Sequence, residues 1–261
     1  MKFDYIVDTH THIDMLETIS PEEAVKNAYE YGVKRLILPC SDAKDINIVN
    51  ELSLRYENVY ALLGVHPSEI AGWNNNIADK IRKLIKENRK IIGIGEIGLD
   101  YHWDDTNKDE QKHAFIDQIR LANELKLPIC IHDRDAHKDT LDILKEYNNG
   151  LPGVLHCFSG SVEFMRECIK EGYYIALGGV VTFKNAQKVK DVAKEVPLER
   201  LLLETDAPFL TPEPYRGTEN QPAYTKFVAE KIAQIREISI EEVINITTEN
   251  AYNLYNLDSI N

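Results

Sequence analysis

The sequence predicts an α/β fold, a closed (β/α)8 TIM barrel that residues 1–261 form as a single domain. Three observations predict it. Eight short apolar runs alternate with longer amphipathic segments, and the length of 261 residues suits one such barrel. The first run leads into His10–Thr11–His12, where an open doubly wound sheet would carry a glycine-rich phosphate loop. Strands and helices in strict alternation indicate parallel strands joined by right-handed crossovers.

The eight apolar runs have the length and composition of strands that are buried on both faces. They are rich in isoleucine, valine and leucine, as strands of a parallel sheet covered by helices are. In chain order, the predicted strands are Phe3–Asp8, Arg35–Pro39, Val59–Gly64, Ile91–Glu96, Pro128–His132, Gly153–His156, Tyr173–Leu177 and Leu201–Glu204.

The segments between these runs show the periodicity of amphipathic helices. The predicted helices include Pro21–Tyr31, Asp42–Tyr56, Ile77–Asn88, Asp109–Leu127, Val162–Glu171 and Ala186–Val196. The first has a strong start signal, with Ser20 at the N-cap, Pro21 at the first helical position and Glu23 three residues after the serine. Two more helices are predicted from Pro222 onward, the second around Ile240–Leu254, and they would complete the outer ring.

The charge balance limits the kind of nucleic acid that this chain could bind. It has 30 basic and 43 acidic residues, a net charge of −13. A protein that coats duplex DNA non-specifically usually carries a basic face, so extended binding to a duplex is not expected. A strand end or a short substrate is still compatible, because metal ions would bring their own positive charge.

The cysteines and the N-terminal residues indicate the cellular compartment that we expect for this protein. The four cysteines form no Cys-x-x-Cys pair and lie in or beside apolar runs, which is typical of reduced, mostly buried thiols. The N-terminus does not resemble a signal peptide, and no apolar run has the length of a membrane span. We therefore expect a cytoplasmic protein with no membrane association; nothing in the sequence favours a particular oligomeric state.

Ionisable residues gather at the predicted carboxyl ends of the strands, where barrel enzymes have their active sites. They are His10, His12, His66, Glu96, His132, His156 and Asp206. Singly, a strand-end histidine is more often a structural hydrogen bonder, and an aspartate before a proline-rich loop is more often a turn former. As a set, these groups would be costly to bury without a cation. His10 and His12 are two residues apart, so both can point into the mouth of the barrel. The set predicts a metal site.

The motifs around these residues resemble those of the TatD family of deoxyribonucleases, within the metal-dependent amidohydrolase superfamily. The resemblance covers nearly the whole chain in order. It rests on Ile6–Asp14, Gly64–Pro67, Gly95–Tyr101, Ile131–Arg134, His156–Gly160, Thr182–Asn185, Glu204–Pro208 and Pro214–Gly217.

The resemblance implies two divalent metal ions, with zinc, manganese or magnesium as candidates. One ion would be held by His10, His12, Glu96 and Asp206, and the other by His132, His156 and the shared Glu96. Glu96 and Asp206 would be the catalytic residues, with Asp206 as general base for a water activated by the metals. Asp8 and Glu204 lie two residues before a ligand, and we expect them to support ligands and not to bind metal.

The implied substrate is DNA, attacked at short or single-stranded ends and trimmed from 3′ to 5′. His66, Arg134, Lys184 and Arg216 would surround the phosphate, since arginine can bind phosphate through two hydrogen bonds. Tyr101, together with Trp103 and Phe158, is a candidate for stacking on bases. Without the resemblance, Lys184 and Arg216 could equally be solvated loop charges, and the aromatic residues could simply cover the barrel mouth.

Three other functions stay open. An amidohydrolase or lactonase would commonly bridge its metals with a carbamylated lysine from the fourth strand, but no lysine lies between Ile91 and Tyr101. Hydrolysis of aminoacyl esters on tRNA is also ascribed to TatD-like proteins. A binding module without catalysis is the third, and it is disfavoured because every ligand position is intact.

Overall fold

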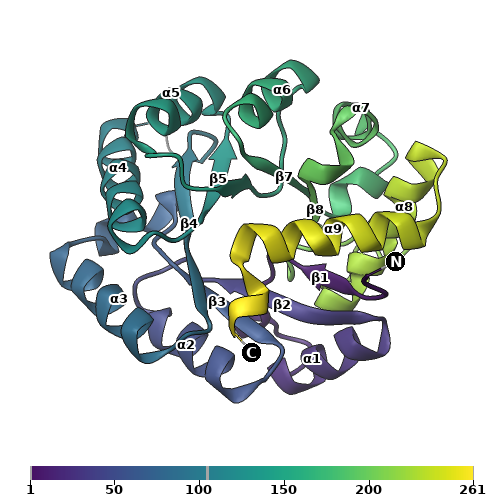
Figure 1. Cartoon of the computed structure of the whole chain (residues 1–261), viewed down its shortest axis with the longest axis horizontal. Coiled ribbons are helices and arrows are strands. Elements are labelled where there is room, and N and C mark those ends of the chain that lie inside the picture. Colours follow the sequence, from purple (N-terminus) through teal and green to yellow (C-terminus); the bar gives the residue numbers. More distant parts are fainter. Residues whose placement is uncertain (1, 104–105, 261) are drawn as a thin grey trace.

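The computed structural model describes residues 2–103 and 106–260, and it confirms the predicted barrel. Eight parallel strands form one sheet in the order β1 to β8 (Figure 1). The strands are β1 Ile6–Asp8, β2 Val33–Pro39, β3 Val59–Leu63, β4 Ile91–Asp100, β5 Ile129–Arg134, β6 Gly153–Leu155, β7 Tyr174–Leu177 and β8 Leu201–Leu203. The last strand returns to the first, because the Thr9 backbone N–H donates to the Leu203 carbonyl at 3.0 Å. One domain over 1–261 stays a prediction, and its two end residues lie outside the described ranges.

Helices surround the barrel as predicted. They are α1 Pro21–Glu30, α2 Ile46–Arg55, α3 Asn75–Glu87, α4 Lys108–Leu125, α5 His137–Tyr147, α6 Val162–Lys170, α7 Gln187–Glu195, α8 Thr225–Arg236 and α9 Ile240–Tyr255. At the start of α1, Ser20 and Glu23 form the predicted reciprocal cap. Helix α5 was not among the predicted helices. It begins at His137, after an Ala136 that offers no side-chain cap.

Two apolar clusters stabilise this arrangement, and alternating strand residues belong to different clusters. On β2, Leu36 and Leu38 join the larger cluster with the helices, whereas Ile37 joins a smaller cluster inside the barrel. The smaller cluster also contains Tyr252 and Tyr255 of α9. Helix α9 therefore closes one end of the barrel, as Figure 1 shows, and the site residues must lie at the other end.

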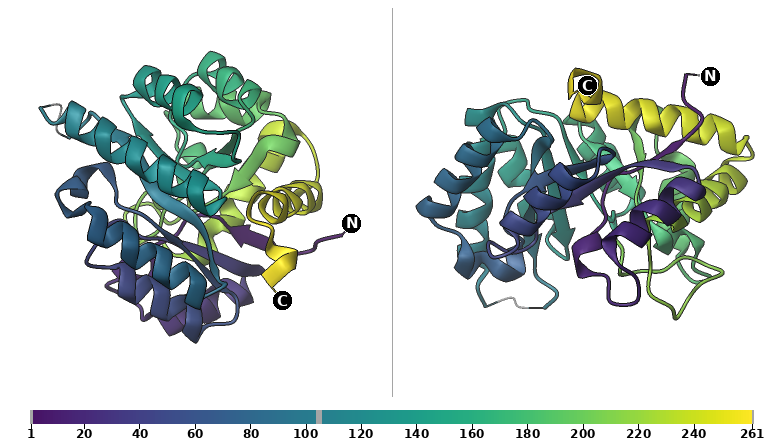
Figure 2. Two further views of the ribbon diagram at one scale, coloured as in Figure 1. Left: turned by 60° about the vertical axis from the view of Figure 1, so that its left-hand side comes forward. Right: turned by 90° about the horizontal axis from the view of Figure 1, so that it is seen from below.

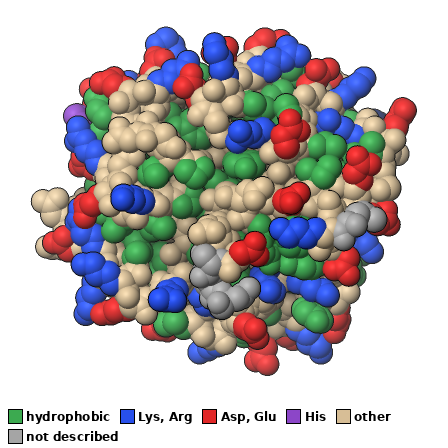
Figure 3. Space-filling model, viewed as in Figure 1, with side chains coloured by type: hydrophobic (Ala, Val, Ile, Leu, Met, Phe, Trp, Pro, Cys, Tyr) green, Lys and Arg blue, Asp and Glu red, His purple; other side chains and the backbone are tan. Residues whose placement is uncertain are grey.

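The two ends of the barrel differ in character. In the right-hand view of Figure 2, α9 and both termini lie at one end, and long loops that follow the strands lie at the other. Figure 3 shows the face that α9 crosses, on which acidic and basic side chains are interspersed around apolar groups. Within the described ranges, no helix is both long and apolar enough to span a membrane. All four cysteines are free thiols, and three of them are buried.

Strand β4 corrects one sequence prediction. Glu96 was expected to end the strand, but β4 continues to Asp100 and places Glu96 within it. The pairing of β4 with β5 shifts register between Ile94 and Ile97, around the cis peptide bond Gly95–Glu96. Beyond the shift, the chain pairs again, with Gly98 opposite His132. A Cβ on Gly98 would lie 2.0 Å from the His132 carbonyl oxygen, so only glycine permits this close approach.

Candidate metal centre

The loops after β1 and β8 are hydrogen-bonded to each other directly beside the site. The His12 N–H donates to the Ala207 carbonyl at 2.8 Å, and the Asp206 N–H donates to the His10 carbonyl at 2.9 Å. These two bonds fix the backbone on either side of His10, His12 and Asp206. Three predicted site residues from opposite ends of the chain are thereby brought together.

The first group of ligand atoms lies around one oxygen of Glu96. The Nε2 atoms of His10 and His12 are 3.1 Å apart, and they lie 3.6 and 3.7 Å from Oδ1 of Asp206. Oε2 of Glu96 is 3.4 Å from Nε2 of His10 and 3.9 Å from Nε2 of His12. Two imidazoles and two carboxylates therefore converge on one small volume.

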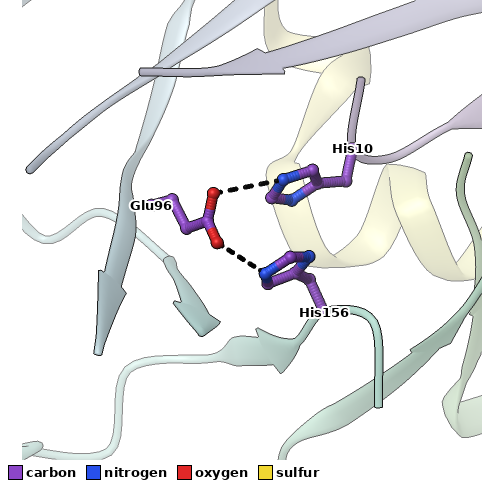
Figure 4. Close-up of side chains that lie close together, drawn as sticks. All are labelled: His10, Glu96 and His156. Atoms are coloured by element: carbon purple, nitrogen blue, oxygen red, sulfur yellow. Dashed lines mark ion pairs between the residues drawn. The ribbon is translucent and has the colours of Figure 1, made fainter. Parts of the chain in front are cut away.

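The second group lies around the other oxygen of the same carboxylate. Oε1 of Glu96 is 2.6 Å from Nε2 of His156 and 2.8 Å from Nδ1 of His132, and these two nitrogens are 3.1 Å apart. Nε2 of His66 lies 3.5 Å from the same oxygen. In Figure 4, Glu96 faces the parallel rings of His10 and His156, which stack with centroids 3.8 Å apart. Glu96 thus lies between the two groups.

The donor set fits divalent cations. Imidazole nitrogens and carboxylate oxygens are the usual ligands of zinc and manganese, and here they approach one another from β1, β3, β4, β5, β6 and β8 or from the loops after these strands. Within the described ranges, groups that could hold an ion include His10–His12–Asp206 and His10–Glu96–His156. Closely spaced imidazole nitrogens beside buried carboxylates would be costly to bury without a cation.

Charge interactions within the site oppose the effect of burial. Burial alone would raise the pKa of Glu96, yet the neighbouring histidines hold that pKa well below its ordinary value. Burial would lower the pKa of His12, but Asp206 and Glu96 raise it to about 9. Burial would also lower the pKa of His132, but Asp100 and Glu96 raise it to about 9. Burial and the charge of His156 lower the pKa of His10 to about 4. The neighbouring histidines thus favour the charged form of Glu96 despite its burial.

A layer of supporting groups surrounds the candidate ligands. Asp8 accepts hydrogen bonds from the Thr205 hydroxyl at 2.7 Å and from the His10 backbone N–H at 3.3 Å. Glu204 accepts from the Cys157 N–H at 2.6 Å, and its Oε1 lies 3.9 Å from Nδ1 of His156. Both carboxyls are fully buried behind the ligands, in the supporting position that the sequence predicted for them.

Asp100 is a site residue that the sequence reasoning missed. Its Oδ2 lies 2.9 Å from Nε2 of His132, on the side of the ring opposite to Glu96. Burial would raise the pKa of Asp100, but the hydrogen bond with His132 lowers it. The signal was its spacing: Asp100 is four residues after Glu96, and residues at even spacing along a strand share a face.

Two cavities meet at this centre. The apolar pocket, of about 270 Å³, lies over β5 to β8 and includes Phe158, Leu177 and Val189 in its lining. The second cavity, of about 500 Å³, lies mainly over β1 to β4, and it is called the polar trough because charged side chains such as Asp42, Lys44 and Glu69 line it. The two share His132, Arg134, His156, Asp206 and Leu210. A substrate bound across the centre would therefore contact two unlike surfaces.

Of the predicted substrate-binding residues, His66 and Arg134 line these cavities and three others do not. The Tyr101 hydroxyl donates to Asp139 at 2.9 Å. Lys184 is exposed. The Arg216 guanidinium lies over the Phe183 ring at 4.0 Å and donates to the Thr211 carbonyl at 3.3 Å. Their roles in binding remain predictions.

A (β/α)8 barrel whose carboxyl-terminal mouth gathers buried histidines around a shared carboxylate defines a metal-dependent hydrolase. Comparison with known proteins narrows this class. The sequence pattern of the TatD related DNases matches residues 7–256, and the chain belongs to the TatD family.

Relatives of similar length support this assignment. The chain is 44% identical over 255 residues to the uncharacterized metal-dependent hydrolase YabD of Bacillus subtilis, covering 97% of this chain and 100% of YabD. It is 36% identical over 263 residues to the uncharacterized metal-dependent hydrolase YcfH of Escherichia coli, covering 98% and 97%. The crystal structure of YjjV, a TatD homologue from E. coli, superposes with a TM-score of 0.90 at 30% identity, covering 96% of this chain and 98% of that one.

Proposed function

We propose that this protein is a deoxyribonuclease that hydrolyses phosphodiester bonds of DNA and trims single strands from the 3′ end. The observation that carries the proposal is the position of Glu96, whose two oxygens face separate groups of histidines. A carboxylate in that position suits a pair of divalent ions, because a shared anion offsets the repulsion between two cations.

The residues of the centre would bind two different metal ions. His10, His12, Glu96 and Asp206 would hold one ion, and His132, His156 and the shared Glu96 the other. Bound divalent ions would polarise a phosphoryl oxygen and lower the pKa of water. Asp206 lines both cavities, and its pKa is lowered because its hydrogen bond with His12 and the nearby histidines outweigh its burial. It would accept the proton as general base.

The phosphate would be oriented by Arg134 and His66, which line the cavities. Arg134 lines the apolar pocket and the polar trough, so its guanidinium can reach a phosphate at their junction. His66 lines the trough, where Ser68 fixes its ring through the Nδ1 atom, 2.8 Å from the hydroxyl and 3.1 Å from the backbone N–H. The free Nε2 of His66 then points to Glu96. Lys184, Arg216 and Tyr101 would contact the substrate only if a longer strand reached them.

Histidine-rich coordination favours zinc or manganese over magnesium on ligand softness, and we propose manganese or zinc as the working ions. The substrate would approach as a free end. The net charge of −13 opposes a long DNA footprint, whereas the ions neutralise a phosphate locally.

A product ladder tests the proposal. Two copies of one oligonucleotide, labelled with fluorescein at the 5′ or the 3′ end, are digested by the manganese-loaded protein. Trimming from the 3′ end gives a descending ladder from the 5′ label and an immediate mononucleotide from the 3′ label. Nicking of closed circular plasmid without end degradation would contradict the exonuclease, and turnover of an aminoacyl-tRNA with no oligonucleotide cleavage would contradict the nuclease.

A further inference from the structure

The apolar pocket is the smaller and more enclosed of the two cavities. Its inner lining includes the buried side chains of Phe158, Leu177 and Val189, while Ser159 at its edge is exposed. The polar trough on the other side of the metal centre is different, since its edge carries the exposed side chains of Trp103 and Phe209. A chain molecule bound at the centre therefore has more room to continue through the trough, which is larger and more open, than through the pocket.

One wall of the pocket belongs to a column of stacked rings. Phe158 stacks on Phe164 with centroids 5.7 Å apart and planes at 12°, and Phe164 stacks on His137 at 4.6 Å and 21°. Nδ1 of His137 lies 2.7 Å from the carboxylate of Asp133, which fixes the far end of the column. A Cβ on Gly160 would lie 2.5 Å from the Phe164 ring and 2.6 Å from the Phe158 ring, so the column requires glycine there. The wall is thus rigid before any ligand binds.

Volume and chemistry limit what the pocket can hold. Its 270 Å³ lies just below the range of about 300–1,000 Å³ for pockets that hold whole drug-sized ligands, so it accepts one ring-sized group. Its apolar wall suits a flat ring, and Arg134 and Ser159 offer donors at its edge. Of the parts of a nucleotide, only the base is a flat ring with weakly polar faces.

We propose that the apolar pocket binds the base of the terminal nucleotide of the strand, with the scissile phosphate at the metal centre. The inference rests on the proposed deoxyribonuclease function and adds a site to it. Because the pocket has room for only one ring-sized group, it admits one nucleotide beyond the scissile bond. The preceding nucleotides lie along the trough, where Trp103 and Phe209 can stack on their bases. The geometry of the pocket is then the reason that the enzyme removes single nucleotides from an end.

Two oligonucleotides with the same 5′ fluorescein label test this assignment. One ends in a 3′ thymidine, and the other ends in an abasic tetrahydrofuran nucleotide. With manganese-loaded protein, removal of the terminal thymidine nucleotide should have a kcat/KM at least about tenfold higher, within the range for stacking of one base. Val180→Trp, which fills the pocket from its lining, should abolish this preference.

Ser159→Trp is the second variant, because an exposed edge residue can be enlarged without disturbing the core. Leu54→Trp, on the exposed face of α2, is the matched control and should keep the preference. Calorimetric binding of thymidine 5′-monophosphate and deoxyribose 5-phosphate gives a readout without turnover, and filling the pocket should make the two affinities equal. If wild type cleaves the oligonucleotides with no base preference, or the filled variants keep the preference, the pocket assignment is overturned. If wild type cleaves neither, the proposed function is overturned with it.

Discussion

Nε2 of His132 lies 2.9 Å from Oδ2 of Asp100, so the ring donates a hydrogen bond away from the metal centre. That bond keeps a proton on Nε2, so Nδ1, 2.8 Å from Glu96, is the nitrogen that would bind a metal ion once it has lost its own proton. A histidine ligand whose second nitrogen donates to a carboxylate is held in one tautomer and one orientation. Asp100 is therefore a positioning residue for one of the candidate metal ligands.

Removing that carboxylate should weaken metal binding. Asp100→Ala is expected to reduce the affinity for manganese by about 10- to 100-fold, the range for loss of a ligand's supporting partner. Asp100→Asn should recover part of it, because an amide oxygen can still accept from Nε2. Competition with a chromophoric chelator measures the affinity without turnover.

The matched control is Asp135→Ala, which breaks the exposed His102–Asp135 pair at 3.0 Å. It should bind manganese as wild type does. Equal affinities for wild type and Asp100→Ala would show that Asp100 does not position His132.

Metal binding should release protons at neutral pH. In the metal-free protein, His12 and His132 have their pKa raised to about 9 by their carboxylate partners, so both carry a proton at pH 7. A metal ion needs neutral imidazole, so each must lose that proton. Calorimetry in buffers of different ionisation enthalpy should find two protons released per chain, one from each histidine, and an affinity that rises with pH up to about 9.

The same shifts set the stability of the metal-free protein. A histidine whose folded pKa is raised from 6.5 to about 9 stabilises the fold fully below pH 6.5, and this contribution is lost as the pH rises through 9. With chelator present, the Tm should therefore fall across this window. A Tm that rises there would contradict the paired, protonated state of His12 and His132.

Asp206→Asn should separate catalysis from folding. Asp206 has a φ of 56°, a left-handed conformation that asparagine adopts as readily as aspartate, so the variant should fold. The amide cannot accept a proton, and kcat should fall by about 10²–10⁴, the range for loss of a general base. Metal content, fixed by reloading, is the control. A loss of less than about tenfold, below that range, would mean that Asp206 only forms the turn.

Most of the fold was predictable because each element carries a local signal. Apolar runs of strand length, amphipathic periods and the Ser20–Glu23 cap are all readable within a few residues of each other. Helix α5 was not named among the predicted helices, although the alternation of strands and helices places one between β5 and β6; its uncapped start does not set it apart, because α2, α4 and α7 also lack a side-chain cap. The extension of β4 was missed because the register shift between Ile94 and Ile97 depends on pairing with β5.

The site was predictable to the extent that strand ends converge in a barrel. That rule gathers His10, His12, His132, His156 and Asp206 without knowledge of their contacts. It cannot show that His132 turns its Nε2 to Asp100, because that contact joins residues 32 positions apart. Nor can it show that Tyr101, next to Asp100, is hydrogen-bonded to Asp139 outside the two cavities.

The central claim is that Glu96 joins two metal sites, and the metal content of the reloaded protein tests it most directly. Elemental analysis after manganese loading and desalting should give two equivalents per chain, because two groups of ligand atoms face different oxygens of this carboxylate. Glu96→Gln, which removes the shared negative charge, should retain at most one. Saturation of the wild-type protein at one equivalent, or two equivalents kept by Glu96→Gln, would contradict the account.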